Sequence, residues 1–223
     1  MKKVPEIFRS LYRFIAHLRE GQRRKWVSIP ADVFVDAQIA SKLWLCRELE
    51  NALKRGSFTG QGALVLHVYA GWCGILPFLI FSRENIEVRR IELTDIDPEA
   101  VAISLQINER WRSAGKYVAY CRDVNDRIPQ KVAFGETPDI LINTSCEHFH
   151  RNDWWQYIQG GTLMVLQGTD MESWDHVTRF ESLSTFRRSF TPWEKILFEG
   201  QLDFCYANLS FSRFMVIGTK GQG

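Results

Sequence analysis

Short apolar runs and helical patterns alternate along most of the chain. From residue 63 onward, aliphatic and β-branched runs typical of strands buried on both faces are separated by stretches with helical spacing. We expect strands at residues 63–71, 88–97, 116–126, 138–145 and 162–170, and helices at residues 75–85, 98–115 and 153–161. Strands and helices that alternate at these lengths predict a parallel sheet covered on both faces.

The two ends of the chain depart from this alternation. Residues 195–207 and 212–219 form two strand patterns with no helix between them, which predicts an antiparallel hairpin. Residues 5–20 place apolar side chains at helical spacing with Arg and Lys between them, and residues 29–56 predict a second helix. The fold class is therefore α/β, with a Rossmann-like, doubly wound, mostly parallel seven-stranded sheet, a C-terminal antiparallel hairpin and an N-terminal helical extension.

Composition and charge limit the domain number and the classes of partner. The chain has 223 residues, of which 45% are hydrophobic and 24% charged, so we expect a helical extension over residues 1–58 and one larger domain over residues 59–223. The net charge of +2 indicates no strong nucleic-acid or membrane partner, although the basic N-terminal helix leaves a nucleic-acid contact open. No apolar run approaches the ~18 residues of a membrane span. Five scattered cysteines favour a cytoplasmic protein.

Each predicted parallel strand ends in polar or glycine-rich sequence. Ligands of open parallel sheets bind beyond these carboxyl ends. Gly71 and Gly74 are expected to let the backbone approach a ligand with which a Cβ would collide. The helix that follows them would point its N-terminus at a ligand carboxylate. Asp95 follows at about the spacing of an acid that binds ribose hydroxyls, and Asp123 could accept a hydrogen bond from an exocyclic amine. Asp97, directly before a proline, is the better helix cap and leaves Asp95 for the ligand.

Several of these segments resemble motifs of a known family in the order in which the family has them. The segments are ALVLHVYAGWCG, IELTDIDPEAVAISLQIN, YCRDVND, PDILINTS and GGTLMVLQG, and they resemble the class I S-adenosylmethionine-dependent methyltransferases over about residues 60–218. INTSCEHF and SRFMVIG further resemble a methyltransferase-like group of bacteria and phages. The glycine motif departs from the family, because His67 stands where the family has an acid and only two of its glycines remain.

The resemblance implies S-adenosyl-L-methionine as the cofactor and assigns its binding residues. The loop after the first strand would hold the methionine part, the acid after the second strand the ribose, and the third strand end the adenine, while the fourth strand end would face the reacting methyl group. The cofactor-binding residues implied in this way are Tyr69, Gly71, Trp72, Gly74, Asp95, Ile96, Asp123, Val124 and Asn143.

The fourth strand end also supplies the candidate catalytic residues. Glu147 and His148 are an adjacent acid and imidazole, and either could take a proton from a hydroxyl or an amine. His148 is the better base near neutral pH, and Ser145 could position the acceptor. A packed histidine without chemistry is the alternative for His148. We expect methyl transfer to a small molecule or another polar acceptor.

Two other functions and one metal site are alternatives to this prediction. The protein could use S-adenosylmethionine otherwise, by aminocarboxypropyl transfer or cofactor cleavage, or it could be a non-catalytic binding module of the same fold. A metal site built from Cys146, His148 and His150 is disfavoured, because three ligands within five residues rarely surround one tetrahedral ion. We therefore predict no metal.

Overall fold

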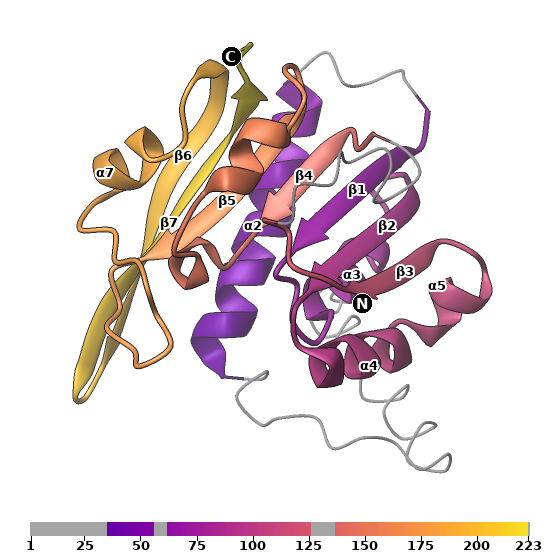
Figure 1. Cartoon of the computed structure of the whole chain (residues 1–223), viewed down its shortest axis with the longest axis horizontal. Helices are drawn as coiled ribbons and strands as arrows, with labels where there is room; N and C mark the ends of the chain where they lie inside the picture. The colour runs from indigo at the N-terminus through magenta and orange to yellow at the C-terminus, as the bar shows by residue number, and fades with distance from the viewer. Residues whose placement is uncertain (1–34, 56–61, 126–136, 223) are drawn as a thin grey trace, which may run out of the picture.

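The computed structural model describes residues 35–55, 62–125 and 137–222 (Figure 1). The predicted basic helix over residues 5–20, the first part of the predicted second helix and the predicted domain boundary near residue 58 lie outside these ranges. Within the described ranges, no helix combines the length and the apolarity that crossing a lipid bilayer requires.

A mixed β-sheet forms the centre of the molecule (Figure 1). In the described part of the chain it has seven strands in the order β3-β2-β1-β4-β5-β7-β6. The five strands β1 to β5 are parallel, and β7 runs antiparallel to both β5 and β6. The strands are β1 Leu64–Tyr69, β2 Val88–Asp95, β3 Tyr117–Cys121, β4 Ile140–Asn143, β5 Leu163–Thr169, β6 Trp193–Tyr206 and β7 Leu209–Lys220. The predicted fold class is confirmed, including the C-terminal hairpin.

Burial along the strands explains why the sequence pattern identified them. Every residue of the central strands β1, β4 and β5 is buried, as near-continuous apolar runs predict for parallel strands covered on both faces. The edge strand β6 instead mixes exposed and half-buried positions, which suits a strand with one neighbour only. The order of strands places β1 and β4 side by side at the middle of the sheet, and β1 ends next to β4.

One face of the sheet is covered by α2 (Asp36–Arg55), α3 (Ile75–Phe81) and α4 (Pro98–Ile107). The apolar side of α2 packs across β6 and β7 and against α3, with Leu45 and Leu49 fully buried. The single helix predicted over residues 98–115 is divided into α4 and the short α5 (Glu109–Ser113). Asn108 lies between them, and its buried side-chain amide donates to the carbonyl of Gly74, 2.9 Å away. This contact ties the α4 end to the loop after β1.

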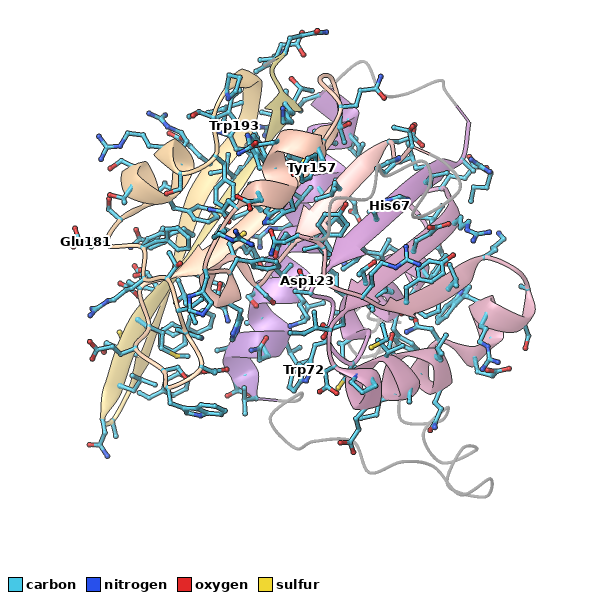
Figure 2. The ribbon with its side chains drawn as sticks, viewed as in Figure 1. His67, Trp72, Asp123, Tyr157, Glu181 and Trp193 are labelled. Atoms are coloured by element: carbon cyan, nitrogen blue, oxygen red, sulfur yellow. The ribbon has the colours of Figure 1, made fainter. Side chains whose placement is uncertain are left out.

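The opposite face is covered by an aromatic layer next to β4, β5 and β7. The 3-10 helix η3 (Asp153–Tyr157) replaces the α-helix predicted there, and α7 (Leu183–Arg188), which has no counterpart in the sequence predictions, packs against β6 and β7. The layer includes the buried side chains Trp154, Trp155, Phe180, Phe186, Phe190 and Phe214. Tyr157 is 38% exposed and lies at the end of η3 (Figure 2).

Candidate functional site

The loop between β1 and α3 has an unusual backbone conformation. Ala70 and Trp72 have φ angles of 46° and 47° although neither is glycine, a conformation that costs free energy and needs support from neighbours. The support comes from β2, because the Asp95 carboxylate accepts a hydrogen bond from the Trp72 backbone amide at 2.7 Å. Trp72 lies at the carboxyl end of β1 (Figure 2).

The two glycines of this loop are required for packing within the protein. A Cβ on Gly71 would lie 2.7 Å from Leu93 Cγ, and a Cβ on Gly74 would lie 2.8 Å from the Asn108 side-chain amide. Gly74 also has a positive φ of 73°. The approach of a ligand stays the prediction for both glycines, and the structure adds a second reason: in both cases a Cβ would meet the neighbouring strand or helix.

The end of β2 presents a fixed acid followed by an exposed apolar side chain. The second oxygen of Asp95 accepts from the Asp97 amide at 3.0 Å, and burial raises the pKa of Asp95 even though these amides oppose the shift. Ile96 follows with 71% of its surface exposed. Asp97 caps α4 by accepting from the Glu99 amide at 2.8 Å. The prediction that Asp97 is the helix cap is therefore confirmed, and the role of Asp95 in ligand binding stays a prediction.

The end of β3 carries the other two residues assigned to adenine. Asp123 is exposed, and one of its oxygens accepts from the Asn125 amide at 2.8 Å, which closes a turn. Val124 is half-buried and packs against the aromatic layer. Asp123 lies toward the middle of the molecule, near the ends of the parallel strands (Figure 2).

The loop after β4 contacts the loop after β1. The Ser145 hydroxyl donates to the Ala70 carbonyl at 3.3 Å, and the fully buried Asn143 accepts from the Ser145 amide at 3.0 Å. The Asn143 side-chain nitrogen has no hydrogen-bond partner among the described residues. Asn143 pairs with Tyr69 in the ladder between β4 and β1. The structure thus brings Tyr69, Asn143 and Ser145 together.

The two candidate bases occupy different environments. Glu147 is 1% exposed and forms an ion pair of 2.6 Å with Arg213 on β7. His148 is exposed, its Nδ1 lies 3.1 Å from the Asp175 carbonyl, and its ring meets the ring of His176 edge-on. A role of Glu147 or His148 as the base that removes a proton stays a prediction. Glu147 is buried and already engaged by Arg213, whereas His148 is open to an approaching acceptor, so the geometry favours His148.

Four residues near this site were missed by sequence reasoning. Arg213 lies within SRFMVIG, a segment noted only for its resemblance, and Asp175 and His176 lie in a stretch without periodic pattern. Lys42 on α2 is the fourth: burial, and after it the charge of Arg213, lowers its pKa to about 7. No spacing rule connects these positions to β4, because the fold alone brings them close.

The fold of this chain is similar to that of proteins of known structure, although its sequence is not closely similar to theirs. No family model and no curated protein matches the sequence. The N-methyltransferase NodS from Bradyrhizobium japonicum WM9, in complex with S-adenosyl-L-homocysteine, superimposes with a TM-score of 0.61 at 12% identity, covering 91% of this chain and 98% of that one. The CurJ carbon methyltransferase gives 0.59 at 11%, covering 85% and 57%.

A third similar structure is that of an enzyme named for another reaction. The [4+2]-cyclase SpnF gives a TM-score of 0.55 at 12% identity, covering 80% of this chain and 81% of that one. Identities this low establish the arrangement of elements and leave the chemistry open. The chain therefore has the Rossmann-like fold that NodS and CurJ share.

Proposed function

We propose that this protein is an S-adenosylmethionine-dependent methyltransferase that acts on a small molecule or another polar acceptor. The observation that carries the proposal is the pair at the end of β2: Asp95, fixed by two backbone amides, and Ile96, 71% exposed beside it. A fixed carboxylate suits ribose hydroxyls, and an exposed aliphatic side chain next to it suits the face of a purine. The fold shared with NodS, a protein crystallised with S-adenosyl-L-homocysteine, adds support.

The remaining cofactor residues have roles that fit their positions. The loop of Tyr69, Gly71, Trp72 and Gly74 would hold the methionine part, with the Trp72 backbone fixed by Asp95. Asp123 keeps one carboxylate oxygen outside its turn and would accept from the adenine amine, with Val124 beside the ring. The buried Asn143 offers a side-chain N–H group that no described residue accepts. When bound, S-adenosylmethionine supplies an activated methyl group on its sulfonium.

The acceptor would bind on the side of the β4 loop. Ser145 lies there against the β1 loop, and His148 is the exposed member of the acid–imidazole pair. Positioning the acceptor accounts for most of what such an enzyme must supply. A group that removes a proton is needed as well when the acceptor is a hydroxyl or an amine.

Calorimetric titration of the full chain with S-adenosylmethionine and S-adenosylhomocysteine tests the proposal. We expect both to bind, and Ile96→Ser to weaken the affinity by about tenfold, because an exposed side chain that covers one ring face contributes about 1–2 kcal/mol. Leu209→Ser is the matched control, since Leu209 is also an exposed aliphatic residue, 45% exposed, on β7.

Three outcomes would contradict the proposal in different ways. Absence of binding of either compound would favour a non-catalytic module. Equal loss in Ile96→Ser and Leu209→Ser would remove Ile96 from the site. If turnover leaves methylthioadenosine in place of S-adenosylhomocysteine, the reaction is aminocarboxypropyl transfer and methyl transfer is excluded.

A further inference from the structure

Glu147, His148 and His176 bring three metal-binding side chains together beside the β4 loop. One ligand atom of each residue lies within 4.8 Å of those of the other two. Glu147 and His148 directly follow β4, whereas His176 comes from the segment after β5. The group therefore differs from the disfavoured set of Cys146, His148 and His150.

The hydrogen bonds of both histidines favour the tautomer in which Nδ1 is protonated and Nε2 is available to bind a metal. His148 Nδ1 lies 3.1 Å from the Asp175 carbonyl, and His176 Nδ1 lies 2.8 Å from the Met171 carbonyl. A carbonyl oxygen only accepts, so Nδ1 carries the hydrogen in each ring and the lone pair of a neutral ring is on Nε2. Histidines that bind metals commonly donate their other N–H group to a carbonyl in this way.

Glu147 has one carboxylate oxygen that is buried without a hydrogen-bond donor in the described part of the chain, which is an independent indication of a bound cation. Its Oε1 accepts from Arg213 Nη1 at 2.6 Å, but its Oε2 is buried and has no hydrogen-bond partner among the described residues. The side chain as a whole is 1% exposed. A buried carboxylate oxygen without a partner costs free energy, and a cation bound to it would remove that cost.

The backbone fixes the three residues relative to one another. The Glu147 carbonyl accepts hydrogen bonds from the amides of Val177 and Thr178, at 3.0 and 2.9 Å. These bonds attach the segment that carries His176 to the loop that carries the other two ligands. The centroids of the two imidazole rings lie 4.9 Å apart at an interplanar angle of 88°. These main-chain bonds hold the two segments of the cluster together.

We propose that Glu147, His148 and His176 form a binding site for one divalent first-row transition metal ion. Two imidazole nitrogens and one carboxylate are a ligand set of zinc and non-haem iron sites, and imidazoles are poor ligands for Mg²⁺. Three protein ligands leave coordination positions open for a further oxygen. In this arrangement Glu147 and His148 act as ligands and not as bases.

The catalytic use of the ion rests on the proposed methyl transfer, whereas ion binding itself does not. An acceptor hydroxyl bound at an open position would have a lowered pKa and would release its proton to water more readily. The proposal thus favours an acceptor with an oxygen that can bind a metal.

Titration of the EDTA-treated full chain with ZnCl₂ tests the site by calorimetry. We expect one Zn²⁺ per chain, and a loss of affinity of more than about tenfold in both His148→Ala and His176→Ala. His150→Ala is the matched control, because His150 is exposed and lies two residues from His148 but outside the cluster. Titration with CoCl₂ should show visible bands without thiolate charge transfer, which excludes the exposed Cys121 and Cys205 as ligands.

Several results would overturn the metal site. They are the absence of Zn²⁺ binding in the unaltered chain, unchanged affinity in His176→Ala, an equal loss in His150→Ala, and binding of MgCl₂ as tight as that of ZnCl₂. Titration of the same samples with S-adenosylmethionine separates the two proposals. Zn²⁺ binding without cofactor binding would reject the proposed function alone, and cofactor binding without Zn²⁺ binding would reject the metal site alone.

Discussion

His67 is a titratable side chain in the fully buried strand β1. Burial, and to a smaller extent the charge of Arg90, lowers its pKa to about 3. The Glu92 carboxylate lies 3.7 Å from the His67 ring but is itself engaged by Arg90 at 2.6 Å. The ring is therefore neutral in the folded protein at pH values where it is protonated in the unfolded chain.

This difference predicts that the protein loses stability as the pH falls. Between the unfolded pKa of about 6.5 and the folded pKa of about 3, the unfolded chain binds a proton that the folded protein does not bind. The free energy of unfolding should then fall by up to about 1.4 kcal/mol for each pH unit in this window. Urea denaturation at pH 7, 6 and 5 measures it.

His67→Asn provides the comparison, because it removes the titrating group while the carboxylates titrate equally in both proteins. The variant should show a flatter dependence on pH between 7 and 5. An identical slope in the two proteins would mean that His67 does not cause the loss.

At the scale of single elements, the neighbouring acids Asp95 and Asp97 are predicted to have different roles, since Asp97 caps α4. Asp97→Ala removes the side-chain oxygen that accepts from the Glu99 amide and should lower the free energy of unfolding by about 1 kcal/mol. The affinity for S-adenosylmethionine should not change, because the Asp97 backbone amide still donates to Asp95. Chemical denaturation and calorimetry measure the two quantities.

Asp95→Asn is the matched variant, and it should weaken cofactor binding. If Asp97→Ala reduces the affinity as strongly as Asp95→Asn, the assignment of the ribose to Asp95 alone would be wrong. If Asp97→Ala leaves the free energy of unfolding unchanged, the cap makes no contribution.

The elements that the sequence predicted well are those with a strong local signal. The apolar runs of β1, β4 and β5 and the Asp97–Pro98 start of α4 depend on neighbours in the chain. The break at Asn108 was missed because it depends on a hydrogen bond to Gly74, 34 positions away. For the same reason η3 was expected as an α-helix, since its tryptophans pack against distant aromatic residues.

At the scale of the whole molecule, the sequence predicted the sheet and only one side of the candidate site. Strand ends can be read along the chain, so Asp95, Asp123 and Asn143 were found as candidates. Arg213 and His176 reach the β4 loop from the antiparallel hairpin and from the segment after β5. No local sequence pattern predicts that these residues lie beside the β4 loop, because their proximity depends on the order of β4, β5 and β7 in the sheet.

The Glu147–Arg213 pair connects the parallel half of the sheet with the hairpin, and we predict that its removal has a large effect on stability. Arg213→Met leaves the Glu147 carboxylate buried without its counter-charge and should lower the free energy of unfolding by about 3–5 kcal/mol. Denaturation should be measured in EDTA-treated protein, so that a bound cation does not replace the lost guanidinium.

The double variant Glu147→Met with Arg213→Met tests whether the loss of stability in Arg213→Met comes from the unpaired buried charge of Glu147. Removing both charges leaves neither of them buried alone, and such replacements are often neutral or stabilising. The double variant should therefore be more stable than Arg213→Met by itself, although it should lose Zn²⁺ binding. If Arg213→Met is as stable as the unaltered chain, the two halves of the sheet are not joined energetically by this pair, and Glu147 is free to act in another role.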